Sequence, residues 1–238
     1  MDKNNDGKEL SFVEHLEELR RRLIYCLVFI SVFFFASLSF SKQILHFLTK
    51  DIDTLVYITP TEVFVSYLYI SLVTSVALSL PVIFYNIWKF VWVALTERER
   101  KAAAVYIPLS AIFFLLGTAF SFYAVIPLAL KFLLSMAPEG IRPMLSVLKY
   151  ISFIGMMMLV FGLAFELPMV LTLLTRLGIV NHIFLSRKRR HAILIIFIVA
   201  AIFTPPDAFT QILLAVPLVL LYEIGILFSR MASPRSRL

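Results

Sequence analysis

The chain has 238 residues, of which 61% are hydrophobic and only 16% charged. A soluble domain is nearer half apolar, with about a quarter of its residues charged, so a soluble core could not bury this much apolar surface. The composition therefore excludes an ordinary soluble protein and predicts an integral membrane protein. The net charge of +7 fits basic loops at a lipid surface better than nucleic-acid binding.

Six apolar stretches are candidates for membrane spans within one all-α membrane domain that covers residues 1–238. A charged, amphipathic helix is expected in residues 1–22, followed by spans at about 23–40, 67–88, 104–128, 151–175, 192–203 and 212–228. The fifth stretch has only 12 strongly apolar residues, about 18 Å of helix against a hydrocarbon core of about 30 Å. The last two helices should therefore form a short hairpin that thins the bilayer or leans on its neighbours.

Prolines punctuate the predicted spans. Each lacks a backbone donor and should kink its helix, which either favours a cupped, curved shell of helices or merely serves packing. The prolines in question are Pro81, Pro108, Pro127, Pro168 and Pro217. Two glycines that are seven residues apart, Gly155 and Gly162, should share one helix face and form a helix–helix contact.

The distribution of basic residues predicts the orientation in the membrane. Of the 22 lysines and arginines, 17 lie in the N-terminal segment, in segments 89–103 and 176–191, and in the C-terminal tail. Because basic loops stay in the cytoplasm, six spans place both termini there.

Two acidic clusters are expected on that cytoplasmic side. Glu14 and Glu18 lie in the N-terminal amphipathic helix, for which Ser11 is a plausible N-cap and in which Glu18 and Arg22 are spaced as an ion pair. The second cluster, in "KFVWVALTERERK" (89–101), contains Glu97 and Glu99 in a predicted loop.

Aromatic side chains precede the second cluster at Trp88, Phe90 and Trp92. Carboxylates bind guanidinium groups bidentately, and aromatic faces accept cations or apolar side chains. The combination predicts a site for a basic peptide that carries arginines followed by an apolar stretch. The alternative is a solvated, salt-bridged surface with no ligand.

Acidic residues also occur in the C-terminal half. Glu166 falls near the middle of the fourth span, where a carboxyl is costly, so it indicates a proton relay, a polar anchor for a ligand or an interhelical hydrogen bond. Glu223 lies nearer the cytoplasmic end and should reach the interface or a basic loop residue. Asp207 and Gln211 flank the extracytoplasmic break "TPPDAFTQ", and Asp207 is placed to cap the last helix.

No pattern for catalysis stands out. The four histidines are scattered, and the single cysteine, Cys26, lies in an apolar run, so no metal site, cofactor or catalytic residue is predicted. We therefore do not expect an enzyme, and a membrane-embedded hydrolase is disfavoured. The competing interpretation is a proton-coupled secondary transporter that uses Glu166.

Several motifs in order resemble the TatC family, the polytopic core component of the twin-arginine protein translocase. They are "HLEELRRRL" (15–23), "LPVIFYNIWKFVWVALTERERK" (80–101), "APEG" (137–140), "FGLAFELP" (161–168), "TPPDAFTQILLAVPL" (204–218) and "EIGILFSR" (223–230). The resemblance covers nearly the whole chain and implies six tilted helices in a cupped, glove-like arrangement.

The resemblance also implies a function. Twin-arginine signal peptides of folded precursors would bind at the cytoplasmic face of the bacterial inner membrane, and export would be driven by the proton-motive force. TatA- and TatB-like single-span subunits, membrane lipid and further copies of the chain would be its partners. By motif, the implied signal-recognition positions are Phe90, Glu99, Glu18 and Arg20, next to the acidic Glu14 and Glu97. Glu166 matches a polar residue of the concave membrane face, and Asp207 and Gln211 match the last extracytoplasmic loop and the start of the final span.

Overall fold

The computed structural model describes residues 12–50, 52, 55–92, 97–136, 144–204 and 207–232, without the side chains of 12–15, 88, 90–92 and 97–107. The expected cap at Ser11 and the motif at 137–140 lie outside these residues. The described elements are almost entirely helical, which confirms the predicted all-α membrane fold.

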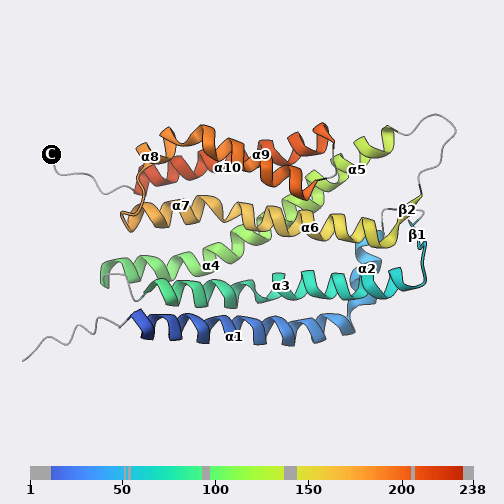
Figure 1. Cartoon of the computed structure of the whole chain (residues 1–238), viewed down its shortest axis with the longest axis horizontal. Helices are drawn as coiled ribbons and strands as arrows, with labels where there is room; N and C mark the ends of the chain where they lie inside the picture. The colour runs from blue at the N-terminus through green and yellow to red at the C-terminus, as the bar shows by residue number, and fades with distance from the viewer. Residues whose placement is uncertain are drawn as a thin grey trace, which may run out of the picture.

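The helices run along one another in a layered bundle (Figure 1). They are α1 (Phe12–Ser39), α2 (Ser41–Thr49), α3 (Thr61–Trp92), α4 (Glu97–Phe120), η1 (Ser121–Val125), α5 (Ile126–Ser135), α6 (Val147–Phe165), α7 (Leu167–Arg176), α8 (His182–Arg187), α9 (Arg189–Phe203) and α10 (Ala208–Ala232). Here η1 is a π-helical turn that joins α4 to α5.

Five described stretches are long and apolar enough to cross a membrane. They are Leu16–Ser39, Thr61–Ile87, Pro108–Ser135, Val147–Arg176 and Ala208–Ala232. The short α9 has only 15 residues, about 22 Å of helix, as its apolar run predicts. By contrast, α10 has 25 residues and is longer than the expected stretch at 212–228.

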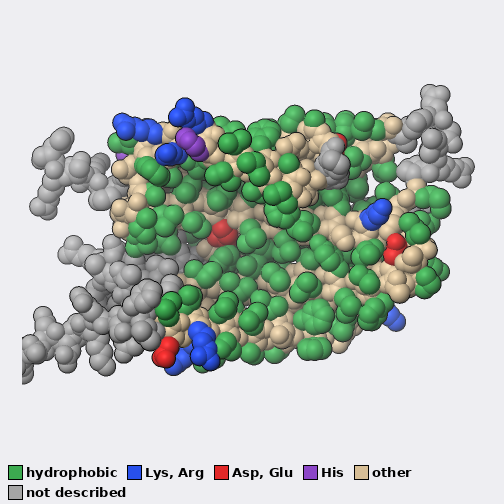
Figure 2. Space-filling view, in the orientation of Figure 1, with side chains coloured by type: hydrophobic (Ala, Val, Ile, Leu, Met, Phe, Trp, Pro, Cys, Tyr) green, Lys and Arg blue, Asp and Glu red, His purple; other side chains and the backbone are tan. Residues whose placement is uncertain are grey.

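Basic residues gather mainly at one end of the bundle, where α1 begins and where α3, α7 and α10 end. We call this the basic end. Figure 2 shows hydrophobic side chains over most of the visible face and lysines and arginines toward its ends, with a group over α8 and the start of α9. The described basic residues at the basic end are Arg20, Arg21, Arg22, Lys89, Arg176, Arg187, Lys188, Arg189, Arg190 and Arg230.

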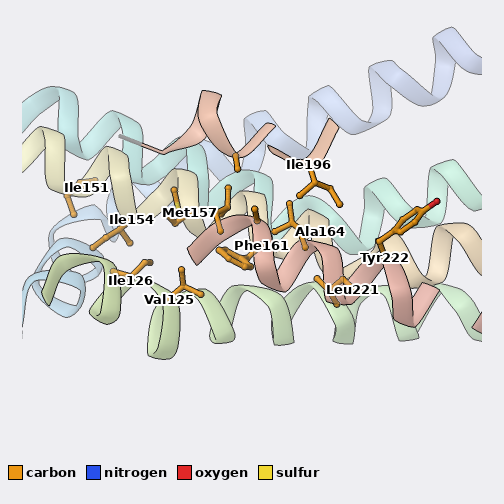
Figure 3. Packing of buried hydrophobic residues seen from close by; sticks show 14 of the residues in the cluster. Val125, Ile126, Ile151, Ile154, Met157, Phe161, Ala164, Ile196, Leu221 and Tyr222 are labelled. Atoms are coloured by element: carbon orange, nitrogen blue, oxygen red, sulfur yellow. The ribbon is translucent and has the colours of Figure 1, made fainter. Parts of the chain in front are cut away.

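The centre of the bundle is α6. Ile151, Ile154, Met157 and Phe161 are at most 2% exposed and belong to one buried cluster that extends to α10 (Figure 3). A string of large apolar residues on one helix can be buried in a membrane protein only by other helices, so α6 sets the positions of its neighbours.

Glycines let the neighbours approach α6 closely. A Cβ on Gly155 would lie 2.8 Å from the ring of Tyr69 on α3, and one on Gly162 would lie 2.3 Å from the ring of Phe114 on α4. The predicted helix–helix contact is therefore confirmed, but the two glycines contact two different helices. Small residues at such contacts allow close backbone packing, which drives helix association in lipid.

Prolines act in two ways. Pro81, Pro108 and Pro217 lie inside α3, α4 and α10. Pro127 and Pro168 stand instead in the first turns of α5 and α7, where a missing N–H is tolerated. At Pro168 the fourth span is divided into α6 and α7 with Glu166 at the junction.

A small clasp closes the end opposite the basic end. The strands β1 (Leu55–Val56) and β2 (Leu145–Ser146) pair in parallel, an arrangement that the sequence pattern did not predict. Glu62 at the start of α3 accepts a hydrogen bond from the Ser146 hydroxyl at 3.2 Å and one from the Ile58 amide at 2.9 Å. The clasp ties the start of α3 to the start of α6.

Candidate functional site

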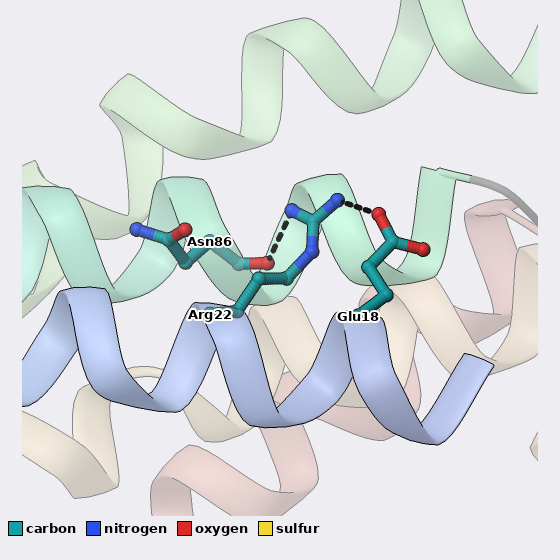
Figure 4. A network of polar contacts seen from close by, with 3 residues as sticks. All are labelled: Glu18, Arg22 and Asn86. Carbon is teal, nitrogen blue, oxygen red and sulfur yellow. Dashed lines mark hydrogen bonds and ion pairs between the residues drawn. The ribbon is translucent and has the colours of Figure 1, made fainter. Parts of the chain in front are cut away.

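The first half of α1 carries an ion pair that faces α3. The guanidinium of Arg22 pairs with the carboxylate of Glu18 one turn earlier, as the spacing predicts, and its Nη1 donates to the Asn86 carbonyl at 3.2 Å (Figure 4). Arg22 is only 8% exposed. A charged side chain is therefore buried between α1 and α3, and it is neutralised there by a carboxylate.

Below this pair, an apolar groove runs between α1 and α3. It has a volume of about 310 Å³ and begins at Leu19 and Arg22. Its walls are formed by Leu23, Cys26, Leu27 and Ile30 of α1 and by Ile83, Asn86 and Ile87 of α3. The surface that the groove presents is apolar, so it suits hydrocarbon and not charged groups.

The apolar stripe of α1, formed by Leu16, Leu19 and Leu23, does not pack against the protein core. Leu16, Leu19 and Leu23 are 48%, 44% and 59% exposed, whereas Arg22 is buried. The solvent for this face is lipid, so apolar side chains gain nothing by turning inward, and the polar side chain turns toward a partner instead.

A second hollow lies on another side of the same helix. It has a volume of about 400 Å³ and is lined by Glu17, Arg20, Arg21, Ile24 and Tyr25. Arg20, a predicted recognition residue, is exposed here. Glu18 and Arg20 therefore serve different faces of α1.

The other predicted recognition residues lie at the basic end, as their backbones show. Phe90 is in the last turns of α3, one turn beyond Asn86, while Glu97 and Glu99 are in the first turn of α4 and Glu14 is in the first turn of α1. These helix ends lie together in Figure 1. Of the four residues, the structure places the backbones only, because their side chains lie outside the described part of the chain.

The segment predicted as a loop at 89–103 is largely helical. The α3 helix continues to Trp92, and α4 begins at Glu97. Glutamate, arginine, lysine and alanine are good helix formers, and acidic side chains stabilise the first turn of a helix. The expectation of a long loop was therefore wrong, because all the described residues of this segment are helical.

Glu166 lies deep in the bundle at the junction of α6 and α7. It is 5% exposed, and its carboxyl lies beside the Ser110 hydroxyl and the Phe114 backbone of α4. Among the described residues, its Oε1 has no hydrogen-bond partner. A buried polar atom without a partner is costly, and in Glu166 that atom belongs to a carboxyl group.

Asp207 and Gln211 organise the turn between α9 and α10. Asp207 accepts a hydrogen bond from the Thr210 amide at 2.7 Å and another from its hydroxyl, so the predicted cap is confirmed. Gln211 donates from Nε2 to the Phe197 carbonyl of α9 at 3.1 Å. Both residues therefore have structural partners in the hairpin.

At the basic end, α10 is tied to its neighbours. Glu223 pairs with Nη2 of Arg189 at 2.8 Å, which confirms the expected basic partner. Ser229 and Thr175 share a buried hydrogen bond of 2.6 Å between their hydroxyl oxygens.

The sequence analysis did not predict the hydrogen bond from Arg22 to the Asn86 carbonyl or the groove between α1 and α3. Asn86 contributes only its backbone carbonyl to Arg22, and a carbonyl has no sequence signature. The side chain of Asn86 bonds back to the Val82 carbonyl at 2.8 Å. The sequence feature that could have pointed to this contact is the presence of an asparagine within an apolar helix.

Comparison with known proteins gives the family. Residues 14–217 match the family described as Sec-independent protein translocase protein (TatC). The chain belongs to the TatC family. It is 38% identical over 234 residues to the Sec-independent protein translocase protein TatC of Desulforapulum autotrophicum, with 95% of this chain and 87% of the relative covered.

Other relatives agree. TatC of Escherichia coli is 34% identical over 225 residues, covering 92% of this chain and 87% of the relative. A crystal structure of the twin-arginine translocase receptor TatC matches with a TM-score of 0.85 and 37% identity, covering 92% of this chain and 99% of that one. The predicted family and its six-helix, glove-like fold are thereby confirmed, and the chain is a multi-pass membrane protein of a bacterial translocase family.

Proposed function

We propose that this chain is the receptor and core of a twin-arginine translocase, and that it binds the arginine pair of signal peptides at its basic end. The observation that carries the proposal is the Glu18 carboxylate, which is already paired with the guanidinium of Arg22, a residue that lines the groove between α1 and α3. A carboxylate that holds one arginine has the chemistry to hold another.

The basic end faces the cytoplasm in this proposal, because most of the lysines and arginines among the described residues lie there. Both termini are then cytoplasmic. Glu18 and Glu99 hold the guanidinium groups of the signal peptide, Glu14, Glu97 and Arg20 shape the surrounding field, and Phe90 packs against the apolar residue that follows.

Transport of the folded precursor requires more than the receptor. We assign that step to TatA- and TatB-like single-span subunits and further copies of the chain, driven by the proton-motive force without a cofactor. Glu166 serves transport and not initial docking, because its carboxyl is buried inside the fourth span, whereas Glu18 lies near the start of the first. Asp207 and Gln211 hold the extracytoplasmic hairpin in place.

Peptide binding tests the proposal. The purified chain should bind a twin-arginine peptide at least about tenfold more tightly than a twin-lysine peptide, because lysine cannot form the bidentate fork. Glu18→Gln and Glu99→Gln should each abolish most of this difference. Glu223→Gln removes the same charge at the same end from α10 and should preserve it. Equal binding of the two peptides would refute arginine recognition.

A proton-coupled secondary transporter is the second candidate, since Glu166 is buried with an unpartnered oxygen. Such a protein would move a small solute across liposomes when reconstituted alone. Proton-coupled solute uptake that is lost in Glu166→Gln would favour it over the receptor.

A further inference from the structure

Consecutive basic residues join α8 to α9, and the proposed function does not use them. The side chains of Arg187, Lys188, Arg189 and Arg190 are all exposed, and Figure 2 shows basic side chains gathered over α8 and the start of α9. Arg189 pairs with Glu223, whereas the other three have no ion-pair partner within the described part of the chain. We call Arg187, Lys188 and Arg190 the basic step.

The basic step is recessed from the end of the bundle. The bond from Arg189 to Glu223 places the start of α9 beside Glu223, and α10 continues from there to Ala232, about 13 Å further. The bond from Gln211 to the Phe197 carbonyl gives a larger offset. Arg189 lies about 12 Å along α9 from Phe197, whereas α10 runs about 31 Å from Gln211 to its end. Both contacts therefore place the start of α9 at least about 13 Å inside the end of α10.

The chain reaches this depth by folding back along α10. The end of α7 is tied to α10 by the bond between the Thr175 and Ser229 hydroxyls, and α8 then returns to the level of Tyr222, whose hydroxyl donates to the Leu185 carbonyl at 3.0 Å. The distance from Ser229 back to Tyr222 is about 10 Å of helix. Contacts from both α8 and α9 to α10 therefore hold the basic step at its recessed position.

The apolar surface of α10 extends beyond the level of the basic step. The membrane-spanning stretch of this helix runs to Ala232, and Leu227 and Met231, which both follow Glu223, are 54% and 77% exposed. Exposed apolar side chains on a spanning helix face hydrocarbon. A flat bilayer that covered them would place the backbone of the basic step within hydrocarbon, where cations are costly.

We propose that the basic step binds the phosphate groups of anionic phospholipids, which are drawn inward along α8 and α9 to the level of Glu223. Arginine binds phosphate through two parallel hydrogen bonds, lysine binds it as a point charge, and basic clusters at the end of a span attract anionic lipid. The short α9, about 22 Å long, matches a bilayer that is thinner at this place. The inference goes beyond the proposed function and does not depend on peptide binding.

The surroundings favour a lipid over an acidic segment of another protein. Ile183 and Phe184 of α8 lie next to the basic step in the chain and are 51% and 49% exposed. A phospholipid satisfies both kinds of side chain, since its phosphate meets the cations and its acyl chains cover the apolar groups. A soluble acidic segment would match the cations and leave the apolar side chains uncovered.

Lipid binding to the purified full chain tests the proposal. Native mass spectrometry would count the phosphatidylglycerol and phosphatidylcholine molecules retained from mixed micelles. The unmodified chain should retain phosphatidylglycerol preferentially. A triple variant, Arg187→Gln with Lys188→Gln and Arg190→Gln, should bind it at least about tenfold more weakly. Arg189 is kept in this variant, because its bond to Glu223 holds α9 against α10.

A matched control removes the same charge from scattered positions. Arg21→Gln, Lys89→Gln and Arg230→Gln replace three exposed cations at the same end of the bundle. Together they should weaken phosphatidylglycerol binding less than about threefold. Equal losses in the two triple variants, or no preference for phosphatidylglycerol in the unmodified chain, would overturn the site. Displacement of phosphatidylglycerol by a soluble glutamate-rich peptide would assign the basic step to an acidic protein segment instead.

A second measurement leaves the basic step unchanged and tests its depth. In a Cys26→Ser background, one thiol is placed at His191, about 3 Å inward from Arg189, or at Leu227, about 6 Å outward from Glu223. In nanodiscs that contain phosphatidylglycerol, a membrane-impermeant maleimide should label His191→Cys at least about tenfold faster, because headgroups and water reach it while hydrocarbon covers Leu227→Cys. Faster labelling of Leu227→Cys would indicate a flat bilayer and overturn the proposal.

Discussion

Arg22 on α1 and Asn86 on α3, separated by 64 positions in the sequence, are joined by a hydrogen bond of 3.2 Å from Nη1 of the arginine to the backbone carbonyl of the asparagine. The same guanidinium binds Glu18, so one side chain both ties α1 to α3 and occupies the carboxylate assigned to the signal peptide. Under the proposed function, recognition requires an exchange of arginines at Glu18.

Removing the internal competitor should strengthen peptide binding. Arg22→Gln leaves the Glu18 carboxylate without its guanidinium, so a twin-arginine peptide should bind about three- to tenfold more tightly, equivalent to about 0.7 to 1.4 kcal/mol. Titration of a labelled peptide by fluorescence anisotropy measures this. Arg21→Gln, which removes the same charge from an exposed position, should give a smaller gain. Weaker binding by Arg22→Gln would show that Arg22 positions Glu18 and does not compete for it.

The contact between α4 and α6 should not tolerate a methyl group at Gly117. A Cβ there would lie 2.4 Å from the backbone oxygen of Phe161, which cannot move aside as a flexible side chain can. Gly117→Ala should lower the free energy of unfolding by about 1 to 3 kcal/mol. Thermal unfolding in detergent would measure the loss.

Gly178 offers a matched comparison. It has a φ of +70° and open space around its Cα, so Gly178→Ala introduces backbone strain without a clash. The cost should be about 1 kcal/mol. If Gly117→Ala proved no more harmful than Gly178→Ala, close packing at Gly117 would not be important for stability.

At the N-cap of α10, asparagine should replace Asp207 without loss of stability, whereas alanine should not. Asp207→Ala removes the bonds to Thr210 and should cost about 1 kcal/mol of stability, while Asp207→Asn keeps an acceptor for the amide. Thermal unfolding separates the two variants. A transport defect in Asp207→Asn at full stability would reveal a role for the charge beyond capping.

Glu166 should be required for transport and not for stability. Its Oε1 is buried without a described partner, so Glu166→Ala removes one costly polar atom together with the contacts to Ser110 and the Phe114 backbone, and these two effects on stability should largely offset each other. We expect unchanged binding of the twin-arginine peptide and a loss of export of at least about tenfold, measured in membrane vesicles with a folded precursor. Normal export by Glu166→Ala would show that Glu166 contributes only to packing.

A second variant, Glu166→Gln, separates the role of the charge from the role of a polar contact. Glu166→Gln keeps the size and polarity and removes the capacity to ionise. Export by Glu166→Gln with failure by Glu166→Ala would assign a polar contact, whereas failure of both would assign the carboxyl group itself.

The sequence by itself determined the class of the protein and most of its helices. A chain that is 61% apolar must be solvated by lipid, and lipid forces backbone hydrogen bonds to close within helices. Local signals also sufficed for the ion pair of Glu18 with Arg22, the cap at Asp207 and the shortness of α9, since each depends on neighbours a few residues away in the chain.

The tertiary structure alone decided which faces of the helices meet. In water, an apolar stripe marks the buried face of a helix, but in lipid the stripe on α1 can lie outward, and Leu23 is indeed exposed while Arg22 is buried. The same holds for the carbonyl of Asn86 and the pairing of Leu55 with Leu145, which depend on distant segments. Because lipid does not distinguish an outward apolar face from an inward one, contacts between helices cannot be read from hydrophobicity and are set by close packing and by polar groups that need partners.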